Sequence, residues 1–316
     1  MPVYPFAGQS ASCRSPGCRC HGRAASYPSD TADAQWQVLE PEARAVMAGL
    51  VQASGRPMVH DLRAMVDAVF YVVKNGVEWR ALPVDFPPHA AVYKFFERWS
   101  QRGLPEELVH RLRRRLRARQ GRDPDPTASI VDSQIVKAAD TVSKNSRGFH
   151  GGKKINGRGR HVAVDVEGWL LSIVVTGAQI SDRAGARLLV MRLLNVFTTL
   201  QIMWADSGYD GKPLASWIER FAAITLQIIK RSDLPGFQVV SRRWVVERTF
   251  GWLLRYRRLV RDYERRIEHH EAMVYWATVM IMTRRLARYE TGAPPIGRWG
   301  GQRGTPLPSG QDQQPA

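Results

Sequence analysis

The stretch Ile202-Met203-Trp204-Ala205-Asp206-Ser207-Gly208 is a short apolar run that ends on an acidic residue. A second run of this kind, Ile130-Val131-Asp132-Ser133-Gln134, lies earlier in the chain. Both have the length of a strand, and side chains at the ends of neighbouring strands can converge. A third carboxylate, Glu247, lies in the helical pattern Arg243-Trp244-Val245-Val246-Glu247-Arg248. We predict that the three carboxylates meet at one site, although each taken singly also fits an ordinary surface charge.

Carboxylates held close together repel one another unless cations bridge them. Oxygen-only ligands favour Mg²⁺ or Mn²⁺, and a pair of such ions suits an in-line displacement at a phosphodiester. We therefore predict that Asp132, Asp206 and Glu247 are catalytic and hold two ions of Mg²⁺ (or Mn²⁺).

The chain is strongly basic. Its 46 Lys and Arg residues outnumber 29 Asp and Glu residues, which gives a formal charge of +17 and a pI near 10.4. Such an excess indicates a polyanionic partner, of which nucleic acid is the leading candidate. Arginines cluster between residues 111 and 122 and again between 242 and 266. For the first cluster, a solvated helix face is an equally good interpretation.

Residues 31–122 have a helical pattern. Two apolar stripes, Leu62 to Val73 and Val92 to Trp99, predict amphipathic helices, the first of which stops at Gly76. The pair is similar to a helix-turn-helix, with a DNA-reading second helix. The alternative is a helical bundle that only supports the rest of the chain. Three cations on the outward face of the second helix are the predicted DNA contacts: Lys94, Arg98 and Arg102.

A proline-rich hinge at 123–127 precedes a mixed α/β pattern over 128–290. Strands are expected near 128–133, 160–166, 169–176, 200–206 and 224–230, and helices near 182–196, 212–222 and, as one long helix, from about 241. This order places Asp132 and Asp206 at the ends of adjacent parallel strands.

The segment Ser146 to Arg160 is rich in glycine and cations, but it lacks the spacing of a nucleotide-binding loop. We predict a flexible basic loop that grips DNA phosphates through Lys153 and Lys154. His161 follows this loop and is expected to be structural, as one histidine beside a strand usually is.

Residues 1–30 and 291–316 have the composition of disordered ends. Cys13, Cys18 and Cys20, followed by His21, offer four ligands for zinc, but their spacing matches no common zinc module. Disorder is the preferred interpretation of this segment.

The longest apolar run, Ala272 to Met282, is too short to span a membrane and predicts a buried helix. The N-terminus lacks the apolar core of a secretory signal. A cytoplasmic location is expected.

The chain resembles the DDE transposases of bacterial insertion sequences, in their insertion-sequence-five-like branch. The resemblance extends from about Trp36 to about Tyr289. It implies an RNase H-like catalytic domain, with a mixed five-stranded sheet and flanking helices, preceded by an all-α helix-turn-helix-like domain. The residues that carry it are Val131-Asp132-Ser133-Gln134, Gly151-Gly152-Lys153-Lys154, Arg160-His161-Val162-Ala163-Val164-Asp165, Trp204-Ala205-Asp206-Ser207-Gly208-Tyr209, Ile229-Lys230-Arg231-Ser232-Asp233 and Arg242-Arg243-Trp244-Val245-Val246-Glu247-Arg248-Thr249-Phe250.

The family also has a Tyr-x2-Arg-x3-Glu-x6-Lys signature, which this chain matches in part. Arg243 and Glu247 occupy the Arg and Glu positions and share one helix face. Val240 and Leu254 replace the Tyr and the Lys. The resemblance implies that Arg243 contacts a phosphate near the scissile bond, and Lys230 and Arg231 are expected to bind DNA as well.

The activity implied is cleavage of a strand at an element end, followed by attack of the freed 3′-hydroxyl on target DNA. Double-stranded DNA, as terminal inverted repeats and as target, is the expected partner, and a homodimer is expected on DNA. Two alternatives remain open: a structure-selective nuclease on the same fold, and a catalytically inactive DNA-binding derivative of a transposase.

Overall fold

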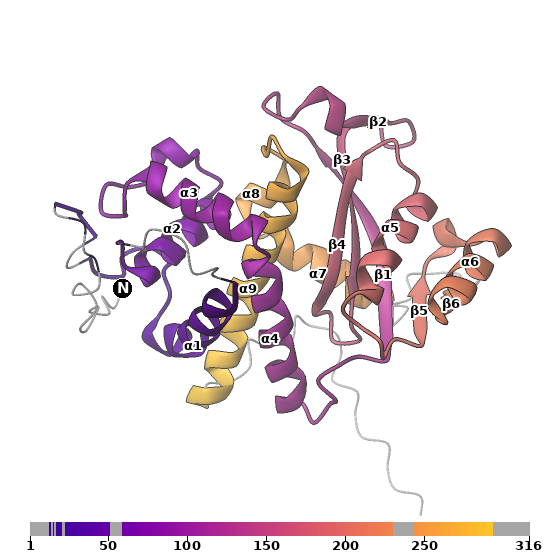
Figure 1. Cartoon of the computed structure of the whole chain (residues 1–316). Coiled ribbons are helices and arrows are strands. Elements are labelled where there is room, and N and C mark those ends of the chain that lie inside the picture. Colours follow the sequence, from indigo (N-terminus) through magenta and orange to yellow (C-terminus); the bar gives the residue numbers. More distant parts are fainter. Residues whose placement is uncertain are drawn as a thin grey trace, which may run out of the picture.

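The computed structural model describes residues 13, 15, 17–20, 23–50, 59–229 and 243–292. A helical part and a part built on a sheet lie side by side, and α4 (Leu104–Arg119) and α9 (Ile267–Thr291) run between them (Figure 1). The helical N-terminal part and the mixed α/β part predicted from the sequence are therefore both present.

The helical part contains α1 (Asp33–Leu50), α2 (Leu62–Asn75), the 3₁₀ turn η2 (Trp79–Ala81), α3 (His89–Gln101) and α4. The Asp61 side chain accepts a hydrogen bond from the amide of Ala64 and so caps the start of α2. Gly76 ends this helix in the left-handed conformation, as predicted. Residues 76–88 connect α2 to α3, a longer connection than the three or four residues of a compact helix-turn-helix.

The sheet is mixed, with strand order β2-β3-β1-β5-β6 and β4 beside β3. β1 is antiparallel to β3 and parallel to β5, which is parallel to β6, whereas β3 pairs antiparallel with β2 and β4. Its strands are β1 (Ala128–Lys137), β2 (Gly148–His150), β3 (Ile155–Val164), β4 (Leu170–Gly177), β5 (Ile202–Ala205) and β6 (Thr225–Ile228).

The sheet corrects two expectations. Five strands were predicted, and the described residues contain a sixth, β2, which lies with the start of β3 inside the segment expected to be a flexible basic loop. Arg158 and Arg160 of that segment are fully buried in the protein, where they cannot grip phosphates. The tip of the β2–β3 hairpin, with Lys153 and Lys154, is exposed.

Helices cover both faces of the sheet. On one face, α5 (Asp182–Leu194) and α6 (Lys212–Ala222) enclose a core with Val131, Ala163 and Met203. On the other face, α7 (Arg243–Leu253), α8 (Arg257–Val260) and α9 share one continuous core with α1 to α4. The 3₁₀ turns η3 (Lys144–Ser146) and η4 (Ser207–Tyr209) complete the described elements.

The predicted long helix from about residue 241 is wrong, because the chain breaks after α7 and again after α8. The second break lies at Asp262, which forms a parallel bridge with Ala138 beyond the end of β1. Its carboxylate also pairs with buried Arg158 at 2.9 Å. A helical backbone could not make this bridge, so the helix restarts only at Ile267.

The first arginine cluster is largely structural. Arg117 pairs with buried Asp165 at 2.7 Å and so ties α4 to the end of β3. Arg113 is fully buried, and its guanidinium lies over the Phe197 ring. Arg115 bonds Glu42 and Glu290. Most of this charge therefore joins elements of the protein instead of facing a partner.

Part of the segment expected to be disordered is packed onto α2. Arg23 is buried and pairs with Asp30 at 2.7 Å and with Asp85 at 3.0 Å. The Tyr27 ring stacks on Phe86. The described residues of 1–30 are thus held by a charged and aromatic network that spacing alone does not reveal.

Helix α7 is held against the turn between β3 and β4. Arg248 donates a hydrogen bond to the Glu167 carbonyl and Thr249 donates one to the Gly168 carbonyl, at 2.7 and 2.8 Å. Gly168 has a φ of +84°, and a Cβ there would lie 2.9 Å from the Thr249 hydroxyl. Glycine at this turn therefore allows α7 to approach the sheet.

No helix among the described residues is long and apolar enough to cross a membrane.

Replacing Gly168 with alanine should lower the free energy of unfolding by about 1–3 kcal/mol, because a left-handed residue would be strained and would also collide with α7. Thermal unfolding measures the change. Gly49→Ala is the matched control, since its Cβ would meet nothing within 4 Å, and it should not destabilise the protein. Equal unfolding midpoints for the two variants would contradict this account.

Because His110 is buried, we expect the protein to lose stability in mild acid. Burial, and then Arg113, lower the pKa of His110 to about 3. In the unfolded chain this histidine has a pKa near 6.5 and therefore binds a proton more readily than in the folded protein. Lowering the pH thus favours the unfolded state, and stability that is present above pH 6.5 is lost as the pH falls towards 3. As the pH falls from 7.5 to 5.5, His110 should lower the free energy of unfolding by about 1 kcal/mol. The variant His110→Gln should not show this loss, whereas the exposed control His89→Gln should still show it. If the free energy of unfolding depended on pH in the same way in both variants, His110 would not be the cause of the loss.

Candidate active site

Asp132 and Asp206 lie level with one another on adjacent parallel strands. The β1–β5 register pairs Ala128 with Ile202 and Ile130 with Trp204. Two residues further along each strand, the same register brings Asp132 opposite Asp206. Asp206 directly follows β5, as predicted, but Asp132 lies within β1, which continues to Lys137 because it pairs with β3.

Both carboxylates are on the α7 face of the sheet. Side chains alternate along a strand, so Asp132 shares a face with Ile130, and Asp206, whose backbone is still extended, shares one with Trp204. Ile130 and Trp204 belong to the core that contains α7, whereas Val131 belongs to the core on the other face.

Glu247 is an exposed residue of α7, which packs against β1 and β3. Its neighbours in the chain determine its position: Val245 and Val246 are buried against the sheet, and Thr249 is bonded to the β3–β4 turn. The helix that carries the third predicted carboxylate thus lies on the sheet face of the other two.

A fourth carboxylate, which the sequence analysis missed, lies beside this site. Asp182 is the first residue of α5, after the capping residue Ser181. Its side chain accepts a 2.5 Å hydrogen bond from the Ser133 hydroxyl, next to Asp132. A Cβ on Gly208 would lie 3.0 Å from an Asp206 carboxylate oxygen and 3.5 Å from one of Asp182. Acidic residues are common in the first turn of a helix, so the sequence around Asp182 does not indicate that it belongs to the site.

The negative charges of this cluster act on the phenol of Tyr209. This last residue of η4 is buried, and burial, followed by the charges of Asp132, Asp182 and Asp206, raises the pKa of Tyr209 well above its usual value. The three aspartates are therefore close enough to act on one group. A cation at this position would be favoured for the same reason.

Two other titratable residues, one on β3 and one just after it, are structural. His161 is buried, its ring bonds Thr176 at 3.0 Å, and a Cβ on Gly185 of α5 would collide with it. Asp165 is buried just beyond the end of β3 and is paired with Arg117.

The predicted DNA contacts lie in several places. Lys94, Arg98 and Arg102 are exposed on or just after α3, and Lys153 and Lys154 are at the tip of the β2–β3 hairpin. Arg243 is the first residue of α7, one turn before Glu247. Lys230, Arg231 and Val240 lie outside the described residues, and Leu254, at the position of the signature lysine, is exposed just after α7.

Two relatives of the chain are a putative transposase and an uncharacterised protein. A putative transposase for insertion sequence element IS402 from Burkholderia cepacia is 30% identical over 146 residues, which is 42% of this chain and 65% of that protein. The uncharacterised protein y4sN from Sinorhizobium fredii is 26% identical over 106 residues, 34% of this chain and 74% of that protein. The chain thus spans slightly under two thirds of the first relative's length.

Among solved structures, the piggyBac transposase synaptic complex with hairpin DNA matches with a TM-score of 0.39 and 8% identity, over 84% of this chain and 74% of that one.

Two family profiles cover most of the described chain. The "Transposase DDE domain" family matches residues 123–282, and the "Putative transposase of IS4/5 family" matches residues 32–109. The chain belongs to the DDE transposases, in the group of the insertion sequence families four and five.

Proposed function

We propose that this protein cuts DNA at the ends of an insertion sequence and joins the freed 3′-hydroxyl to target DNA, with residues 128–290 as an RNase H-like catalytic domain. The observation that carries the proposal is the shared register of Asp132 and Asp206, with α7 and its Glu247 on the same sheet face. Family membership supports the same reaction class.

The residues at this site suit divalent cations. The donors are carboxylate oxygens, which prefer Mg²⁺ or Mn²⁺. Burial, and then the charges of Asp132, Asp182 and Asp206, raise the pKa of Tyr209, and such ions would offset those charges. Asp132, Asp206 and Glu247 would hold two ions, whose chemistry is to lower the pKa of water and stabilise charge on a phosphate.

The protein's own groups would orient the reaction. The sheet positions Asp132 and Asp206 without a long loop, which would favour a fixed separation of the two carboxylates during the reaction. Asp182 keeps the Ser133 side of β1 in place through its hydrogen bond. Arg243, on the same helix face as Glu247, would bind a phosphate near the scissile bond.

DNA recognition is assigned to residues 31–122. The exposed cations of α3 would read the element end, and Lys153 and Lys154 would contact phosphates beside the catalytic carboxylates. Lys230 and Arg231 would add further contacts. Two element ends must be brought together before joining, so we expect a homodimer on DNA.

Changing Asp132 to Asn, Asp206 to Asn or Glu247 to Gln should each reduce cleavage of an element-end duplex at least about 100-fold, because a metal ligand is removed. DNA binding should persist or strengthen slightly, since a negative charge near phosphate is removed. Single-turnover cleavage and strand transfer with Mg²⁺, using the DNA that flanks the gene, measure both steps.

Glu219→Gln is the matched control, because this carboxylate is exposed on α6 away from the site, and it should cut normally. A variant of the three that retains Mg²⁺-dependent cleavage would remove its residue from the site. Wild-type cleavage without joining would instead identify a structure-selective nuclease, and binding without cleavage an inactive derivative.

Replacing Lys94, Arg98 and Arg102 with alanine should abolish the preference for the element end over random DNA. It should also reduce the slope of the logarithm of the binding constant against the logarithm of salt concentration, by about 0.9 for each phosphate that the variant no longer neutralises. Fluorescence anisotropy of the full chain at several salt concentrations measures both quantities.

The control replaces three exposed arginines on α1, α5 and α6 with alanine: Arg44, Arg187 and Arg220. It makes the same change in net charge and should keep end preference. If both triple variants bind DNA equally weakly and neither loses preference, α3 does not read DNA.

A further inference from the structure

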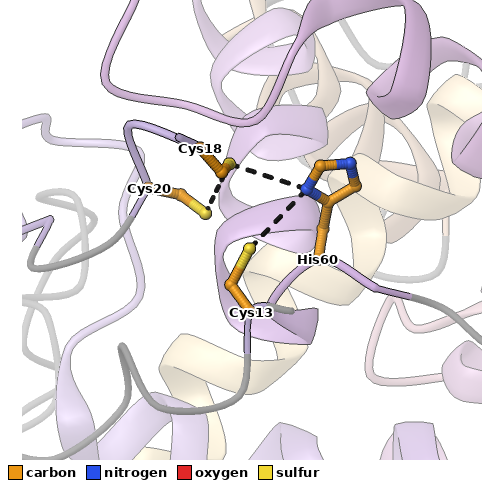
Figure 2. A group of neighbouring side chains, drawn as sticks. All are labelled: Cys13, Cys18, Cys20 and His60. Atoms are coloured by element: carbon orange, nitrogen blue, oxygen red, sulfur yellow. Dashed lines mark hydrogen bonds between the residues drawn. The ribbon is translucent and has the colours of Figure 1, made fainter. Parts of the chain in front are cut away.

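Three cysteines and a histidine that the transposase chemistry does not use meet at the N-terminal side of the molecule (Figure 2). The sulfurs of Cys13, Cys18 and Cys20 and a ring nitrogen of His60 all lie within 4.8 Å of one another. Figure 2 shows the four side chains pointing at a common centre. The cysteines are buried and His60 is partly buried. His21, weighed as a ligand from the sequence, is outside the described residues; the histidine brought to the cysteines is His60.

Local structure positions each group. Asp61 caps α2, which places His60 immediately before the helix. Gly17, with a φ of +70°, turns the chain between Cys13 and Cys18, and the Cys18 amide closes this turn on the Ser15 carbonyl at 3.2 Å. The three cysteines and Ala64 of α2 form a small cluster that is separate from the main cores.

The donor atoms match tetrahedral zinc in type and nearly in spacing. With Zn–S near 2.3 Å and Zn–N near 2.0–2.1 Å, a tetrahedral site requires S···N of about 3.6 Å and S···S of about 3.8 Å. The His60 Nδ1 lies 3.6 Å from the Cys18 sulfur and 3.8 Å from the Cys13 sulfur. Cys18 and Cys20, at 2.9 Å, would separate by about 0.9 Å to admit an ion.

The geometry points to a structural zinc site formed by Cys13, Cys18, Cys20 and His60 Nδ1. Three thiolates and one imidazole fill the four positions of zinc and leave none for substrate, so the site is closed and serves the fold. Soft sulfur ligands also separate it chemically from the oxygen-only site proposed on the sheet.

Such a site would fasten the segment before Arg23 to the start of α2. The next residues are already held by the buried pairs of Arg23 with Asp30 and Asp85, and Asp85 lies in the connection that leads to α3. Zinc would extend this attachment to Cys13, Cys18 and Cys20, whose apolar cluster with Ala64 is small. It would thereby stiffen the base of the helix proposed to read DNA.

The test uses the full chain, expressed with zinc and purified under reducing conditions. Elemental analysis should find about one zinc per chain, absent from Cys18→Ser and His60→Ala but kept in the exposed-histidine control His89→Ala. Asp132→Asn should also keep zinc, so failure of the carboxylate site would not affect this result.

Metal-stripped wild-type protein provides a second measurement that does not depend on how the variants fold. Cobalt added to it should produce thiolate-to-metal charge-transfer bands with tetrahedral d–d absorption. Zinc should slow alkylation of all three cysteines and raise the midpoint of thermal unfolding.

Two outcomes would overturn the proposal. One is a wild-type protein that neither carries zinc nor gives the cobalt bands. The other is alkylation of Cys13, Cys18 and Cys20 at rates that zinc leaves unchanged, as expected for thiols or for a Cys18–Cys20 disulfide.

Discussion

The buried ion pair between Arg158 and Asp262 is the contact on which the path of the chain depends. Both side chains are fully enclosed and lie 2.9 Å apart. Burial by itself would raise the pKa of Asp262, but His270 and Arg158 lower it to about 2. Removing one partner would leave an uncompensated buried charge, at a cost of about 3–5 kcal/mol.

The pair holds the link before α9 against the sheet, and α9 then packs against α1, α2 and α4 on one side and β4 on the other. The helical part and the sheet are joined through this helix.

The charge of the chain has two uses. Arg113, Arg117, Arg158 and Arg160 are buried and connect elements, so they add to the net charge without presenting it to a partner. The exposed cations of α3 and of the β2–β3 hairpin present theirs to solvent. Net charge therefore indicates the class of partner, whereas the burial of each arginine decides which ones can reach it. At the carboxylate cluster the excess charge is negative, because several acids are held close together, and bound cations would reduce their repulsion.

Much of the architecture could be predicted from the chain itself. Amphipathic stripes predicted α2 and α3, and apolar runs predicted β1, β3, β4, β5 and β6 to within a few residues. These signals are local, because burial of one face sets the period of apolar residues along a helix or strand. The family was also recognisable, since its motifs surround Asp132, Asp206 and Glu247 in short contiguous segments, and the profile matches confirm it. The arrangement of the three carboxylates in one metal site remains a prediction.

Other features were decided only by contacts between distant segments. The helix break after α8 follows from the bridge of Asp262 to Ala138, and Asp182 joins the carboxylate cluster through Ser133. His60 meets cysteines that lie forty or more positions earlier, the Cys13–His60 separation being 47. None of these has a periodic signature, because an ion pair, a shared hydrogen bond or a set of metal donors depends on positions in space and not on spacing along the chain. The sequence by itself determined most of the helices and strands, the family and the excess of positive charge. The tertiary structure decided which charges are buried, which acids are neighbours and which histidine lies beside the cysteines, since burial and Coulomb energies exist only after the chain has packed.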